Sequence, residues 1–203
     1  VRKDVSVVRN WLGHDPRTGH MHIPDAPHSR AALSRGVNLY QVDGLLLDAD
    51  LFRRLRLRGE TRGPAGIPDL ETALRLVTGP PFDQLRANGG AWLTDHSYLH
   101  HTLTAAIVDV AHLVVVAALE RHDYPTARAA TEIASLAAPH DEVPNLDKAA
   151  IAAAEGHHQE ADRILRDDIA NRSDDDDPTP QDIPARTQRI INAHKWLTRR
   201  AAS

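Results

Sequence analysis

The chain has 203 residues, enough for one medium-sized domain or for a small domain with an appendage. Hydrophobic residues make up 41% of it and aromatic residues only 4%, and this alanine- and leucine-rich composition favours packed helices over a β-sandwich or barrel. The net charge of −4 argues against a dedicated nucleic-acid-binding protein, and the lack of cysteine excludes disulfides and thiolate metal sites.

Residues 1–44 predict a helix followed by a β-hairpin. Apolar residues recur with helical spacing up to Leu12, where Gly13 can end the helix. The many prolines and glycines that follow argue against further helices. Two short extended pieces, Met21–Pro24 and Val37–Val42, predict the strands of the hairpin, and the polar segment Asp25–Arg35 predicts its long tip.

Residues 45–172 predict a helical domain. A helix over Leu45–Arg58 can begin at Asp48 or Asp50, and its apolar stripe is Leu51, Phe52, Leu55 and Leu57. The segment Gly59–Pro68 predicts a loop. The next helix begins at Pro68, ends at Gly79 and has the stripe Leu70, Ala73, Leu74 and Val77.

The next segment, Ala91–Glu120, predicts one long helix or two nearly continuous ones, and three more helices are predicted over Thr126–Ala137, Asn145–Glu155 and His158–Asn171. The apolar run Ile107–Leu119 contains Asp109 and His112, so it is too short and too polar to span a bilayer and predicts a buried helix. The acidic residues 173–183 predict a linker, and residues 184–203 predict a final amphipathic helix.

Two helix pairs recur at an offset of 34 residues. Ala118 corresponds to Ala152, and Ala127 corresponds to Ala161. The turn at 122–124 corresponds to the turn at 156–158. This is the period of a tetratricopeptide repeat (TPR), in which small residues stand where two helices cross closely. The pattern therefore predicts TPR-like antiparallel helical repeats.

Two runs of residues resemble a known family. They are Leu47–Phe52 and Asp69–Phe82, and the second holds the sequence AL-x-L followed by Gly79-Pro80-Pro81-Phe82. Both are similar to the bacterial transcriptional activation domain of actinobacterial antibiotic regulatory proteins. The resemblance implies a TPR-like domain that regulates transcription by contacting protein partners, such as the transcription machinery, or by pairing with a second copy.

The resemblance extends to the start of the chain. Val5–Gly13 resembles the end of the recognition helix in that family's winged-helix DNA-binding domain, and Tyr40 stands where the wing hairpin returns. The earlier helices and strands of a winged helix are missing, so residues 1–44 resemble half of that domain. A similar arrangement occurs in membrane-anchored envelope proteins with LysM modules, and this alternative stays open.

Candidate catalytic and metal-binding patterns are weak. His96 and His100 have the i, i+4 spacing of zinc ligands, but the glutamate of H-E-x-x-H is missing. Asp174–Asp177 lacks the spaced ligands and the central glycine of a calcium loop. No nucleophile elbow and no phosphate-binding loop is present. We therefore expect no enzyme activity, no cofactor and no metal.

The interaction candidates fall in two places. Arg2, Lys3 and Arg9 would touch nucleic acid if the first helix lies in a major groove, which requires upstream sequence. A partner groove is expected on the first helix of each pair, with candidate residues His112, Val116 and Glu120. We expect a cytoplasmic regulatory module that binds protein partners and has no membrane contact.

Overall fold

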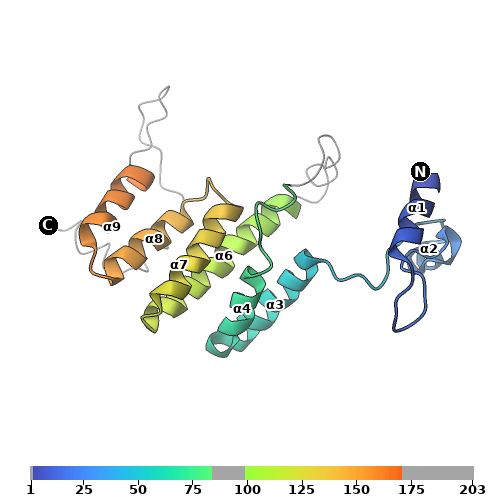
Figure 1. The fold of residues 1–203 in the computed structure, drawn as a ribbon, viewed down its shortest axis with the longest axis horizontal. Helices are drawn as coiled ribbons and strands as arrows, with labels where there is room; N and C mark the ends of the chain where they lie inside the picture. Colours follow the sequence, from blue (N-terminus) through green and yellow to red (C-terminus); the bar gives the residue numbers. More distant parts are fainter. Residues whose placement is uncertain (1, 84–98, 171–203) are drawn as a thin grey trace, which may run out of the picture. The chain divides into compact units, whose positions relative to one another are not determined.

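A computed structural model describes residues 2–83 and 99–170 (Figure 1). The chain is mainly α-helical and these residues contain no β-strand, so the predicted helical class is confirmed. The chain divides into two compact units, which we call unit 1 (Val1–Asp50) and unit 2 (Leu51–Ser203). The predicted acidic linker at 173–183 and the predicted final helix at 184–203 lie outside the described residues.

Unit 1 opens with the predicted helix, α1 (Arg2–Leu12). It stops where the sequence indicates, because Gly13 adopts a left-handed φ of +67° and its N–H donates to the carbonyl of Arg9 at 2.9 Å. The chain then turns back, and the N–H of His22 donates to the carbonyl of Gly13 at 3.1 Å. This return brings the segment after α1 alongside the end of the helix.

The predicted β-hairpin is absent. Among the described residues there is only an isolated bridge between His14 and Met21. The predicted tip, Asp25–Arg35, holds a short 3-10 helix, η1 (Ala26–His28), and an α-helix, α2 (Arg30–Arg35). The prediction that this stretch contains no helix was therefore wrong.

The reason is local capping around α2. The hydroxyl of Ser29 accepts the N–H of Ala32 at 3.0 Å, and Gly36 ends the helix with a left-handed φ of +68°. The segment predicted as the second strand is held by isolated bonds instead of a ladder. The hydroxyl of Ser29 donates to the carbonyl of Leu39 at 2.6 Å, and the side chain of Gln41 accepts the N–H of Ala31 at 2.7 Å.

The helix α3 (Asp48–Arg62) begins at the end of unit 1 and belongs to unit 2 from Leu51 onward. A 3-10 turn, η2 (Gly63–Gly66), and the helix α4 (Ile67–Leu74) follow it. α3 continues four residues beyond its predicted end, and η2 and the start of α4 take up the rest of the predicted loop Gly59–Pro68, so that loop prediction was wrong. The predicted stripe is buried at Phe52 and Leu55, but Leu57 is 67% exposed and does not belong to the core.

α3 and the start of α4 cross closely because glycines stand at the contact. A Cβ on Gly66 would lie 2.0 Å from the carbonyl oxygen of Gly59, and a Cβ on Gly59 would lie 2.4 Å from Leu70 Cδ2. A side chain at Gly66 would force the two backbones apart, and one at Gly59 would displace the side chain of Leu70. The carboxylate of Asp69, at the start of α4, bonds to the guanidinium groups of Arg58 and Arg62 on α3.

Four helices follow: α6 (Leu99–Glu120), α7 (Tyr124–Ala137), α8 (Val143–Ala154) and α9 (His158–Ile164), the last of which continues into a π-helical turn, η3 (Leu165–Ala170). In Figure 1 the helices of unit 2 lie side by side as pairs, α3 with α4, α6 with α7, and α8 with α9. Each pair packs on the next, since α4 contacts α6, and α8 contacts both α6 and α7.

The turns within the last two pairs have matching hydrogen bonds at the offset of 34 residues. The N–H of Asp123 donates to the carbonyl of Ala118 at 2.9 Å, and the N–H of His157 donates to that of Ala152 at 2.8 Å. The residue before each donor is left-handed, with φ of +56° at His122 and +88° at Gly156. The two turns therefore share one backbone conformation.

α6 is longer than the apolar run on which the membrane prediction was based. It has 22 residues and, by length and composition, is apolar enough to cross a membrane. Length alone therefore does not exclude a span, contrary to the prediction. Half of its most apolar window is buried inside unit 2, and a core helix has the same properties.

Candidate functional site

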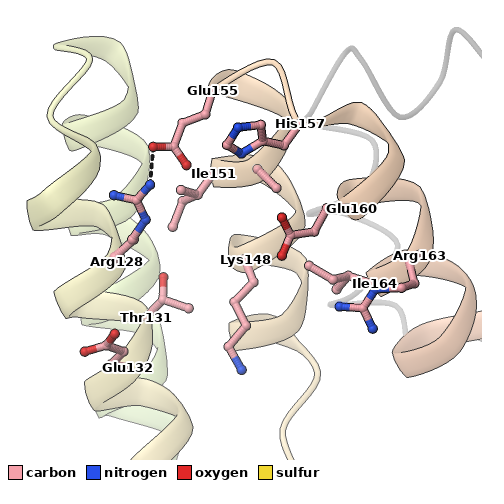
Figure 2. A pocket seen from close by; sticks show the side chains of 11 residues that line it. Arg128, Thr131, Glu132, Lys148, Ile151, Glu155, His157, Glu160, Arg163 and Ile164 are labelled. Carbon is pink, nitrogen blue, oxygen red and sulfur yellow. Dashed lines mark hydrogen bonds and ion pairs between the residues drawn. The ribbon is translucent and has the colours of Figure 1, made fainter.

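A groove of about 550 Å³ lies over α8, between α7 and α9 (Figure 2). It forms because α7 and α9 both pack against α8. Its volume falls in the range of about 300–1,000 Å³ that is usual for ligand sites. Side chains of these three helices and of the turn before α9 line it: Arg128, Thr131, Glu132, Lys148, Ile151, Ala152, Glu155, His157, Glu160, Arg163 and Ile164.

The floor of the groove consists of buried small and apolar side chains. α8 and α9 pack there through a hydrophobic cluster of Ala149, Ala152, Ala161 and Ile164. Alanines at these positions allow the two helices to approach closely. Thr131 of α7 is 1% exposed, and its hydroxyl donates to the carbonyl of Ala127 at 3.0 Å. The floor of the groove is therefore mainly apolar, because its one hydroxyl, that of Thr131, is already hydrogen-bonded within α7.

Charged side chains of both signs surround this floor. Arg128 of α7 forms an ion pair with Glu155, the residue that follows α8, and the ammonium group of Lys148 donates to the side-chain oxygen of Asn145 at 3.2 Å. Figure 2 shows the Glu160 side chain reaching from α9 toward α8. Three charged side chains of the groove are exposed and form no hydrogen bond or ion pair with other described residues: Glu132, Glu160 and Arg163.

The predicted groove residues do not line this groove. All three lie on α6, and Val116 is half-buried while Glu120 is exposed. His112 contacts α8, where its Nδ1 lies 2.7 Å from Oδ1 of Asp147. That carboxylate is 1% exposed, and its other oxygen has no partner among the described residues. The structure therefore places His112 in the interface between two helix pairs.

The predicted nucleic-acid contacts lie on α1 but are not equivalent. Lys3 is exposed. Arg9 is instead tied to its own unit, because its guanidinium donates to the carbonyls of Ile23 at 2.9 Å and Pro24 at 3.2 Å and pairs with Asp25 at 2.8 Å. Arg2 is the remaining member of the predicted set, and its side chain lies outside the described part of the structure.

No group of three or more histidine, aspartate or glutamate side chains is arranged to hold a metal within residues 2–83 and 99–170. His100 lies on α6 in edge-to-face contact with His101, with 5.2 Å between ring centres. Its predicted partner, His96, and the run Asp174–Asp177 lie outside the described residues.

The sequence offered little indication of the groove. Its two walls come from the second helix of each of two pairs, and the sequence-based expectation was the first helix. Arg128 and Glu155, the ion pair between α7 and the end of α8, are 27 residues apart, a separation that matches neither the helical period nor the repeat. Comparison with family models, with curated proteins and with solved structures finds no match for this chain.

Proposed function

We propose that this chain is a non-enzymatic protein-interaction module of a bacterial transcriptional regulator, with TPR-like repeats, which binds a segment of a partner protein in the groove between α7 and α9. The observation that carries the proposal is the composition of the groove. An apolar, buried floor with a charged, exposed rim is the usual anatomy of a protein-binding surface. An enzyme site would instead require positioned reactive groups.

The repeat character supports this function. The last two helix pairs have equivalent turns 34 residues apart, and alanines stand at their close crossings. Stacked repeats of this kind present extended surfaces to peptides or helices of other proteins. The run Asp69–Phe82, which resembles the bacterial transcriptional activation domain, adds the regulatory context and a cytoplasmic location to the proposal.

The charges of the rim indicate what kind of segment fits. Glu132 and Glu160 lie on opposite walls, and Arg163 lies one helical turn beyond Glu160. Since these groups have no ion-pair partners among the described residues, a bound segment can supply them. We expect a segment that carries both basic and acidic side chains around an apolar residue.

Site-specific crosslinking tests the proposal. A photoreactive residue at Glu132 should capture a partner protein in cells, and that partner, once purified, should bind the chain directly. Glu160→Lys should weaken this binding at least tenfold, because the reversed charge repels the basic side chain of the partner.

The matched control is Glu120→Lys, which makes the same charge change on α6, where the sequence placed the groove. It should leave binding within about twofold, since Glu120 does not line the groove. If Glu120→Lys weakens binding and Glu160→Lys does not, the partner binds on α6 and the proposed site is wrong.

DNA binding through residues 1–44 is the alternative function, and Arg9 cannot test it cleanly. Its guanidinium holds the segment after α1, so Arg9→Ala would disturb the unit as well as any DNA contact. Lys3→Glu is the better variant because Lys3 is exposed. Retardation of duplex DNA that is lost in Lys3→Glu would support the alternative.

A further inference from the structure

The exposed face of α3 carries a row of three arginines. Arg54, Arg58 and Arg62 are spaced four residues apart, so they follow one another along the same side of the helix with a rise of about 6 Å between neighbours. All three are exposed, Arg58 and Arg62 at 59% and 54% of their side-chain area. We call this row the arginine ladder.

The rest of α3 explains why the ladder faces outward. Phe52, Leu55 and Gly59 form the buried side of the helix. Arg53 and Leu57 stand on the exposed side beside the ladder, and Leu57 is 67% exposed. α3 therefore has a packed face and an exposed basic face, and the basic face also includes the apolar side chain of Leu57.

The positive charge of the ladder is only partly balanced. Asp69 provides one carboxylate, which Arg58 and Arg62 share. Glu60 pairs with Arg56, which is not part of the ladder. Arg54 forms no hydrogen bond or ion pair with other described residues. Like charges four residues apart on a helix repel each other, and Asp69 offsets this repulsion between Arg58 and Arg62 but not between Arg54 and Arg58.

We propose that the arginine ladder binds the phosphodiester backbone of nucleic acid without reading its sequence. A guanidinium group matches the geometry of a phosphate and can donate two hydrogen bonds to it. A regular row of cations suits a ligand with regularly repeated anions, and binding releases the counterions condensed on that ligand. An arginine-rich stretch such as residues 53–58 is also a known composition for nucleic-acid patches.

This inference does not depend on the proposed function of the groove. The ladder lies on α3 and the groove is built from α7, α8 and α9, so an experiment can disprove one binding surface without affecting the other. The ladder is also distinct from the contacts predicted on α1, where Arg9 is engaged within unit 1. Contacts with phosphates position a protein on nucleic acid, whereas contacts with bases give specificity.

The experiment uses the full 203-residue chain and a fluorescent DNA duplex of arbitrary sequence, with binding followed by anisotropy from about 50 to 200 mM salt. Arg54→Glu should weaken binding about tenfold and lower the slope of log affinity against log salt by about one. Arg54 is chosen because Arg58 and Arg62 both form ion pairs with Asp69, so changing either of them would also disturb the fold. Arg166→Glu, an equal charge change at an exposed position in η3 that does not line the groove, should cost about twofold or less.

Several results would overturn the inference. One is no binding by the unaltered chain at low salt, and another is equal losses in Arg54→Glu and Arg166→Glu, which would reduce the effect to net charge. A loss confined to Lys3→Glu would move the contact to α1. Tighter binding of a polyglutamate peptide than of DNA would assign the ladder to an acidic protein. Melting curves of each variant, followed by helical circular dichroism, separate unfolding from loss of contact.

Discussion

The two units are stabilised in different ways. Unit 1 leaves most of its large apolar side chains exposed: Val7, Val8, Trp11, Leu33, Val37, Tyr40, Val42, Leu45, Leu46 and Leu47. Among the described residues, the only hydrophobic side chains it buries are Ile23 and Ala32. Unit 2 exposes few of this class, and alanine, valine and leucine side chains at or near zero exposure form its core, for example Ala111, Val115 and Leu146.

The difference shows what replaces a core when a small unit cannot form one. In unit 1, side chains bond to backbone groups that regular secondary structure would otherwise satisfy. Arg9 bonds to two carbonyls, and Ser29 both accepts an N–H and donates to a carbonyl. Such bonds contribute about 0.5–1.5 kcal/mol each, whereas full burial of an aliphatic side chain contributes about 1.5–3 kcal/mol. We therefore expect unit 1 to open before unit 2.

The largest expected effect tests whether the stability of unit 2 depends on its buried contacts. His112→Ala removes the hydrogen-bond partner of the buried Asp147 side chain, which should cost about 1–3 kcal/mol of unfolding free energy in urea denaturation. The double variant His112→Ala with Asp147→Ala should lose less than His112→Ala alone, because it leaves no buried side-chain oxygen without its partner. A double variant that is less stable than the single one would show that the pair is not the cause.

The next effect tests unit 1. Arg9→Ala removes a charged donor from two carbonyls and an ion pair, so the backbone amides of residues 2–44 should exchange hydrogen about tenfold faster or more. Exchange in α6 to α9 should not change. Arg35→Ala, at an exposed residue without a partner among the described residues, is the control. Equal acceleration in both units would mean that they unfold as one body.

A smaller effect concerns pH within unit 2. The hydrogen bond from Arg58, with a further contribution from Arg62, holds the pKa of Asp69 below its ordinary value of 3.8 against the opposing effect of burial. Because the pKa of Asp69 is lower in the folded chain than in the unfolded chain, its ionised carboxylate stabilises the fold fully above pH 3.8. This stabilisation is lost as the pH falls through the folded-state pKa.

The difference in melting temperature between the unaltered chain and Asp69→Asn should therefore be constant near neutral pH and shrink below pH 3.8. The control Glu120→Gln, at an exposed carboxylate, should show little difference at any pH. A difference for Asp69→Asn that persists in acid would assign its effect to packing rather than to charge.

The smallest effect compares the two matching turns of unit 2. Asp123 caps α7 by accepting the N–H of Thr126 at 3.2 Å, whereas the equivalent residue, His157, makes no capping bond to α9. His157→Asp should stabilise the chain by about 0.5–1 kcal/mol in thermal denaturation. His158→Asp, one residue later, cannot cap and should gain less. An equal gain in both variants would mean that the helix dipole alone is responsible.

The sequence predicted the helices of unit 2 well because their signals are local. Pro125 and Ala137 stand near the ends of α7, and the apolar spacing in between is helical. It predicted unit 1 poorly for a related reason. The prolines at 24 and 27 and the glycine at 36 indicated loops, but they flank α2, where Ser29 acts as the cap.

By itself, the sequence determined where α1 ends, which segments of unit 2 are helical and which small residues allow their close crossings, because these properties depend on neighbours within a few residues. Only the tertiary structure decided that Arg9 is tied to Ile23, that His112 contacts Asp147, and that α7, α8 and α9 enclose a groove. The physical reason is distance along the chain. Residues 14 to 35 positions apart meet only when the chain folds back or the helices pack, and no local period marks them in advance.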